Sequence, residues 1–236
     1  MDDDGVVEII GGTTLEPDIR PYLASIGRGE STDGTRAEHR CGGTLISPRA
    51  VLTAVHCFTC IENGDGECPA PCTECGAFDP LDWVDFNRHD LTTGTGSPVD
   101  RRTLSDLEGD LNGRQAYVIR HPNWDWIATR FDNDFALIIL DNPVGGITPV
   151  ALNDNPDIPA NRDDELEVFG WGDTDPNDDD GPGNTNFPPL PQIVTVDYLP
   201  DNQCNEAPFD QEITSNMLCA YTPDKDSCQA DSGMCI

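Results

Sequence analysis

The chain has 236 residues, of which 13 are Lys or Arg and 44 are Asp or Glu, so its formal net charge is -31. This acidity argues against nucleic acid or an anionic membrane as a partner, because both require a basic binding surface. It favours a strongly solvated surface suited to a salty medium. No apolar run approaches the roughly 18 residues that a membrane-spanning helix needs.

Short β-rich runs separated by turn signals follow one another along the chain. They lie at residues 21–26, 41–47, 50–55, 83–86, 115–119, 135–140, 166–172 and 193–196. No long helical periodicity, internal repeat or linker interrupts them. The pattern predicts an all-β sandwich or barrel, and the length suits one large domain or two small ones.

Ten cysteines in a chain of this size predict an oxidising compartment, so we expect a secreted protein. Residues 1–5, Met-Asp-Asp-Asp-Gly, have neither the basic start nor the apolar core of a signal peptide. The cysteines carry more weight in our interpretation than this missing signal.

Four of the cysteines, Cys60, Cys68, Cys72 and Cys75, lie in one loop rich in Gly, Pro and acidic residues. Four thiolates could bind zinc, but a loop without its own core more often uses two disulfides, which we expect here. The pairing stays open. It also stays open for Cys228 and Cys235.

An acidic segment at residues 173–181 resembles the start of a calcium loop, since oxygen-bearing side chains alternate along it. However, Asp178 replaces the required glycine and Asn184 stands where the bidentate glutamate belongs. We interpret the segment as a solvated insertion. No metal and no other cofactor is expected.

Three motifs indicate chemistry when they are taken together: Leu-Thr-Ala-Val-His-Cys at residues 52–57, Asp-Asn-Asp-Phe-Ala-Leu at 132–137, and Asp-Ser-Cys-Gln-Ala-Asp-Ser-Gly at 226–233. The order His, Asp, Ser is one of the known chain orders of a catalytic triad. A serine hydroxyl needs a base within hydrogen-bond reach, and a carboxylate must orient that base. We therefore predict Ser232 as nucleophile, His56 as base and Asp134 as its partner. Each alone could be an ordinary core or loop residue.

These segments resemble the chymotrypsin/trypsin-like serine proteases, and the resemblance extends from Ile9 to Gly233. It implies an all-β fold of two packed antiparallel six-stranded β-barrels with a cleft between them. Residues 1–8 would be a propeptide remnant, about 9–120 the first barrel and about 121–236 the second. Because the family's last strands follow the serine motif and this sequence ends at Ile236, we expect an incomplete second barrel.

The resemblance also implies the disulfides Cys41–Cys57 and Cys204–Cys219. The backbone amides of Ala230 and Ser232 would form the oxyanion hole. Ala230 stands where the family carries glycine, and the loss of one such donor costs roughly 3 kcal/mol.

Two further roles follow from the resemblance. Asp226 matches the carboxylate that selects Arg or Lys before the scissile bond. Cleavage before Ile9 would release an amine that pairs with Asp231 and orders the nucleophile loop. Glu8 precedes this bond where relatives cleaved by trypsin carry Arg or Lys, so the activating protease must accept an acidic residue.

The resemblance therefore implies a monomeric serine endopeptidase, secreted as a zymogen, that acts on protein or peptide substrates. An alternative is a non-catalytic homologue that acts as a binding or regulatory protein, because Ala230 and Glu8 depart from the family pattern. A calcium-dependent structural module built on the acidic segment is a third interpretation.

Overall fold

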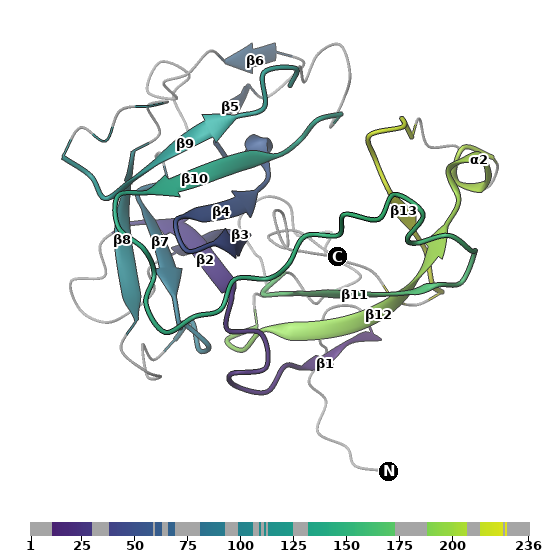
Figure 1. Cartoon of the computed structure of the whole chain (residues 1–236), viewed down its shortest axis with the longest axis horizontal. Coiled ribbons are helices and arrows are strands. Elements are labelled where there is room, and N and C mark those ends of the chain that lie inside the picture. Colours follow the sequence, from purple (N-terminus) through teal and green to yellow (C-terminus); the bar gives the residue numbers. More distant parts are fainter. Residues whose placement is uncertain are drawn as a thin grey trace.

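The structure is a computed structural model, shown in Figure 1. We describe it for the following parts of the chain. The described residues are 11–29, 38–58, 60–62, 66–68, 81–92, 99–105, 109, 111, 113–124, 132–172, 188–206, 213–223 and 225. For residue 38 and for residues 60–62 and 66–68 only the backbone is described.

Seven strands form a closed barrel in the order β10-β4-β3-β2-β7-β8-β9. They are β2 (Leu23–Arg28), β3 (Glu38–Ser47), β4 (Ala50–Thr53), β7 (Trp83–Phe86), β8 (Asp100–Ser105), β9 (Ala116–Arg120) and β10 (Ala136–Leu140). The predicted all-β barrel architecture is confirmed.

Two details of the barrel differ from the expectation. It has one strand more than six, because residues 100–105 and 116–120 form separate strands that meet in a short parallel pairing, Leu104 with Ala116 and Ser105 with Tyr117. It also continues past residue 120, because β10 pairs with both β9 and β4 and so closes the barrel.

Alternating strand residues fill the barrel with aliphatic side chains, and this core includes Ile26, Leu45, Val51, Val84, Val118, Ile138 and Leu140. β3 and β4 approach each other closely at Gly43. A β-carbon at that position would lie 2.7 Å from Cγ1 of Val51. Glycine is thus required there by the packing of the core.

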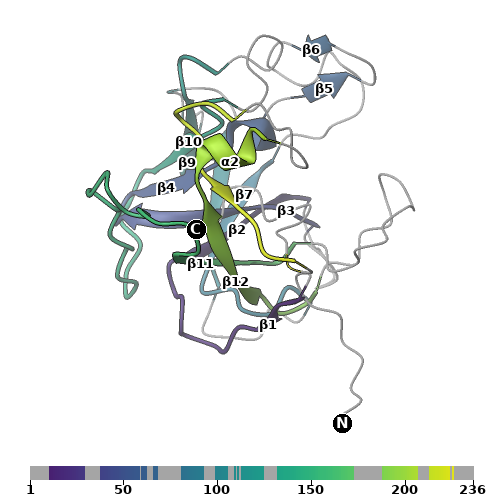
Figure 2. The ribbon, with the colours of Figure 1, turned by 90° about the vertical axis from the view of Figure 1, so that its right-hand side faces the viewer.

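A second, four-stranded sheet lies beside the barrel, as Figures 1 and 2 show. Its order is β1 (Thr13–Thr14), β12 (Gln192–Leu199) and β11 (Glu165–Gly170), and β13 (Cys219–Ala220) also pairs with β12. The short helix α2 (Asp201–Cys204) follows β12. A separate hairpin is formed by β5 (Cys60–Glu62) and β6 (Gly66–Cys68).

A small apolar cluster joins the barrel to the second sheet, and its members are Leu15, Leu23, Leu91, Phe169 and Trp171. The indole of Trp171 also donates a hydrogen bond of 3.2 Å to the carbonyl oxygen of His89. On the outside, Arg20 and Glu167 form an ion pair of 2.6 Å. The two parts are therefore linked by packing as well as by the chain.

No helix within the described parts of the chain combines the length and the apolar character needed to cross a membrane.

Candidate active site

His56 lies on a short 3-10 helix, η2 (Val55–Phe58), that directly follows β4. Val55 and Phe58 are buried in the barrel core, so the residues between them turn toward the surface. Arg120 donates a hydrogen bond of 3.1 Å to the carbonyl oxygen of Phe58. Packing on one side and this capping contact hold the helix that presents His56.

The pairing of two strands brings Asp134 to this place. β4 and β10 are antiparallel, and Thr53 at the end of β4 is opposite Ala136 at the start of β10. His56 comes three residues after Thr53, and Asp134 comes two residues before Ala136. The barrel thus places them side by side although 78 residues separate them.

The carboxylate of Asp134 contacts His56 twice. Its Oδ2 lies 2.5 Å from Nδ1 of the ring, and its Oδ1 accepts a hydrogen bond of 2.9 Å from the backbone N–H of His56. The side chains are 26% and 14% exposed, so water only partly screens the pair. Because an ionised carboxylate can only accept, Nδ1 must carry the proton in this contact. The ring orientation is fixed by the same contact, and Nε2 is the nitrogen that can accept a further proton.

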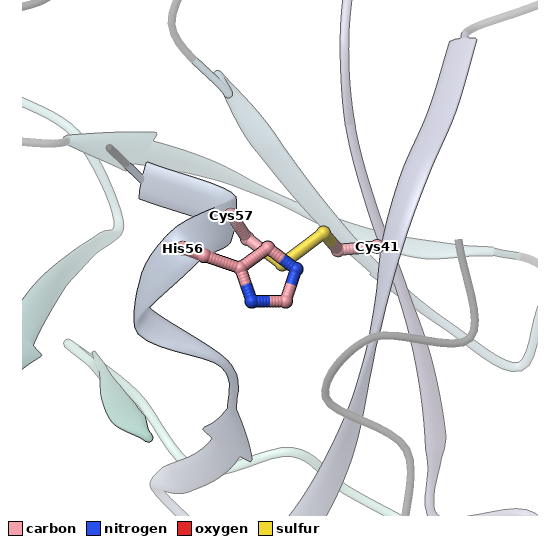
Figure 3. A group of neighbouring side chains, drawn as sticks. All are labelled: Cys41, His56 and Cys57. Carbon is pink, nitrogen blue, oxygen red and sulfur yellow. A yellow bond between two sulfur atoms is a disulfide. The ribbon is translucent and has the colours of Figure 1, made fainter. Parts of the chain in front are cut away.

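Cys41 and Cys57 flank His56 and form a disulfide with an S–S distance of 2.03 Å. Figure 3 shows the imidazole beside the sulfur–sulfur bond. One nitrogen and two sulfur atoms within 4.8 Å of one another could suggest a metal site. Sulfur in a disulfide is not the thiolate that binds a metal, so the cluster fits a structural role: it anchors η2 to β3.

The second expected disulfide is also present. Cys204 at the end of α2 is joined to Cys219 in β13. It closes a loop that contains residues 213–218, and this loop returns toward the barrel, as Figure 1 shows. Both disulfides implied by the resemblance therefore occur in the structure.

The remaining predicted site residues lie outside the described parts of the chain: Ile9, Asp226, Ala230, Asp231 and Ser232. The same holds for Cys72, Cys75, Cys228, Cys235 and the acidic segment 173–181. Their roles stay predictions. For Cys60 and Cys68, the structure describes only that their backbones are opposite each other in the β5–β6 pair.

The other three histidines have different surroundings. His39 is buried, with Nδ1 2.8 Å from the hydroxyl of Ser25 and its ring packed against Trp171. The ring of His121 packs against Phe135, with centroids 4.5 Å apart. The backbone of His89 accepts the hydrogen bond from Trp171. None of these contacts pairs an imidazole with a carboxylate.

One functional candidate was missed from the sequence. Asp132 accepts hydrogen bonds from Thr214 and Asn216, which are 82 and 84 residues away along the chain. The sequence offers no local signal for this contact, because the donors belong to a polar loop whose position depends on the whole second sheet.

The comparisons with known proteins agree with this geometry. The sequence profile of the family Trypsin matches residues 9–66 and 84–234. The chain is 32% identical to anionic trypsin of Canis lupus familiaris over 236 residues, a match that covers 98% of this chain and 74% of that protein. It is 30% identical to cationic trypsin-3 of Rattus norvegicus, with the same two coverages.

A solved structure shares the fold. It is neuropsin, a serine protease expressed in the limbic system of mouse brain, with a TM-score of 0.66 at 23% identity. The superposition covers 94% of this chain and 79% of neuropsin. The barrel, the paired His56 and Asp134, the two disulfides and the profile match lead to one conclusion: the chain belongs to the trypsin family of serine proteases.

Proposed function

We propose that the chain is a serine endopeptidase that cleaves peptide bonds through Ser232, His56 and Asp134. The observation that carries this proposal is the double contact of Asp134 with His56, at 2.5 Å to the ring and 2.9 Å to the backbone. In the trypsin family such a pair serves a serine nucleophile, and Ser232 is in the one motif of this sequence that matches it.

In the proposed reaction, Oγ of Ser232 attacks the carbonyl carbon of the scissile bond while Nε2 of His56 takes its proton. Asp134 stabilises the imidazolium and keeps its orientation. The backbone amides of Ala230 and Ser232 bind the oxyanion. The imidazolium then protonates the leaving amine as the C–N bond breaks, and a water molecule hydrolyses the acyl-enzyme with His56 again as base.

A fluorophosphonate probe on the activated full-length chain tests the nucleophile. We expect one covalent adduct on Ser232, found by peptide mass spectrometry, and no adduct in Ser232→Ala. His56→Ala should abolish cleavage of a peptide substrate, while His89→Ala, a matched control outside the pair, should leave it intact. Absence of the adduct from the activated wild type would contradict the proposal and favour the non-catalytic binding or regulatory homologue.

We also propose that Asp226 selects Arg or Lys before the scissile bond. A hydrogen bond to a charged group contributes about 1.5–3 kcal/mol, which corresponds to roughly ten- to a hundredfold. Asp226→Ser should lower kcat/KM by that factor for an arginyl substrate and leave a leucyl substrate little changed. Equal losses for both would show that Asp226 does not set the specificity.

Activation is the last part of the proposal. The chain would be secreted as a monomeric zymogen, and a protease that accepts Glu8 would release the amine of Ile9 to pair with Asp231. A buried ammonium is stable only beside a carboxylate, which gives this pair its physical basis. Amino-terminal sequencing of the active form should read Ile-Ile-Gly-Gly. If the active form begins at any other residue, the proposed activation is wrong, but the proposal for His56 and Asp134 is unaffected.

A further inference from the structure

A carboxylate lies where the start of β10 meets the loop before β13. Oδ1 of Asp132 accepts a hydrogen bond of 3.0 Å from the hydroxyl of Thr214 and another of 3.2 Å from the side-chain amide of Asn216. In Figure 1 the segment that leads to β13 reaches toward the start of β10. The contact thus joins the barrel to the second part of the molecule close to the catalytic pair.

The loop that supplies both donors is braced at each end. At its start, Asn205 and Ile213 exchange two hydrogen bonds, of 2.7 and 3.2 Å. At its end, Cys219 is tied to Cys204 by the disulfide. Within it, the backbone N–H of Met217 donates to the carbonyl oxygen of Thr214 at 3.1 Å. The turn that carries the two donors is therefore held by contacts that do not involve Asp132.

A tight turn connects Asp132 to Asp134. Asn133 between them has φ of +60°, a conformation that asparagine tolerates better than most residues. The backbone N–H of Phe135 donates to the carbonyl oxygen of Asn133 at 2.8 Å. Asp132 directly precedes this hydrogen-bonded turn of residues 133–135 and Asp134 lies at its centre, so a displacement of Asp132 is transmitted to Asp134.

We propose that Asp132 is a positioning residue for the catalytic pair: it anchors the turn that carries Asp134 to the loop 213–218 and so holds the carboxylate against His56. The proposal deepens the proposed function and rests on it. A displacement of about 1 Å in a catalytic group can cost about a hundredfold in rate. The anchor would therefore act on kcat, while substrate affinity changes little.

The role of Asp132 depends on its acceptor oxygen, because both donors are uncharged. Asp132→Asn keeps Oδ1 and should retain most of the activity. Asp132→Ala removes the acceptor and should lower kcat about ten- to a hundredfold with KM within about twofold, by the same geometric argument. Thr214→Val removes the main donor and keeps the shape, and adding it to Asp132→Ala should cause little further loss. Asp154→Ala, which removes one exposed aspartate elsewhere, is the matched control.

A second measurement does not depend on turnover. The Nδ1 proton shared by His56 and Asp134 should give a low-field proton NMR resonance in the full-length chain. We expect it to shift or broaden in Asp132→Ala and in Thr214→Val, and to stay in place in Asp132→Asn and Asp154→Ala. Thermal unfolding of each variant checks that it is folded. If Asp132→Ala is not folded, Thr214→Val tests the same contact in its place.

An unchanged resonance in the folded variants, or a loss confined to KM, would overturn the proposal. If the wild type shows the resonance but cleaves no peptide, the proposed function fails. The NMR comparison still decides whether Asp132 positions the pair.

Discussion

The barrel and the second sheet are stabilised by the same kinds of contact, but the contacts in the barrel are more deeply buried. Each has its own apolar cluster and disulfide; the barrel also contains a buried ion pair, whereas an exposed one joins Glu167 of the second sheet to Arg20, just before β2. The barrel cluster includes Leu45, Val51 and Ile138 and fills the interior that the closed barrel encloses. The cluster on the second sheet that does not face the barrel consists of Val168, Val194 and Val196, with Leu166 and Ala220 packed against it. The difference teaches that closure gives the barrel the larger enclosed core, so we expect it to be the more rigid part.

The ion pairs of the two parts show the largest contrast. Asp85 is completely buried in the barrel and contacts Arg88 at 2.7 Å and Arg101 through two hydrogen bonds of 2.7 Å. Both guanidinium groups also lie over the ring of Trp83. Removing the carboxylate leaves two partly buried cations uncompensated. Asp85→Ala should lower the free energy of unfolding by about 3–5 kcal/mol.

Glu167 supplies the matched variant on the second sheet. Its ion pair with Arg20 is exposed, so Glu167→Ala should cost at most about 1 kcal/mol. Urea unfolding of both variants measures the contrast. Equal losses would mean that the burial of an ion pair does not determine its contribution to stability in this protein.

Two leucines sharpen the comparison of cores. Leu45 in β3 and Leu199 in β12 are both buried. Leu→Ala substitutions cost about 2–5 kcal/mol, and the cost rises where the surroundings cannot collapse into the cavity. In the same denaturation experiment, the loss of stability should be near the upper end of this range for Leu45→Ala and near the lower end for Leu199→Ala. The reverse order would show that the second sheet is the more rigid part.

The two disulfides close loops of similar length, with sequence separations of 16 and 15 residues. A chain-entropy estimate gives about 3 kcal/mol for each. Replacing either pair by serines should therefore lower stability by a similar amount, measured by thermal unfolding under oxidising conditions. A clear difference would show that the surroundings of a disulfide, rather than loop length, determine its contribution.

The smallest effect concerns pH. The carboxylate of Asp164, just before β11, accepts hydrogen bonds from the backbone N–H groups of Asn161 and Ala160, both at 2.9 Å. These bonds lower the pKa of Asp164. Because the pKa of Asp164 is lower in the folded state, this carboxylate stabilises the fold at pH values above its pKa in the unfolded chain. That stabilisation is lost as the pH falls through its pKa in the folded state.

Asp164→Asn should remove this part of the dependence of stability on pH. An NMR titration of the Ala160 and Asn161 amides measures it, and we expect the acid-side shifts of these amides to disappear in the variant. No described barrel contact depends on Asp164, so the barrel amides should titrate alike in both proteins. Persistence of the acid-side shifts in Asp164→Asn would assign them to another group.

Much of the fold could be predicted from apolar patterns and turn residues. The run 83–86 coincides with β7, and the Pro48–Arg49 turn separates β3 from β4 as expected. β8 was missed, because Asp100, Arg101 and Arg102 look like a solvated loop. The charge of Arg101 is satisfied across strands by Asp85 on β7, a contact that no local pattern reveals. The charge of Arg102 is satisfied within β8 by Asp100.

The candidate site divides in the same way. His56 and Asp134 could be identified because each is in a short motif with a characteristic order along the chain. Asp132 could not be singled out, because its partners Thr214 and Asn216 are defined only by the folded second sheet. Motifs therefore indicate the residues that we propose to react, whereas the residue that we propose to hold them is defined only by tertiary contacts.

The position of β10 in the barrel has a consequence for partial unfolding. β10 is hydrogen-bonded on both edges, by β4 and β9, and it carries Asp134 at its start. His56, Asp134 and the Cys41–Cys57 disulfide all belong to the barrel, so opening of the second sheet alone would keep them on the folded barrel but would break the contact of Asp132 with Thr214 and Asn216. Amide hydrogen exchange should then be slow in β10 and faster in β12, and the proposed catalytic pair would stay on a folded barrel after the second sheet has opened.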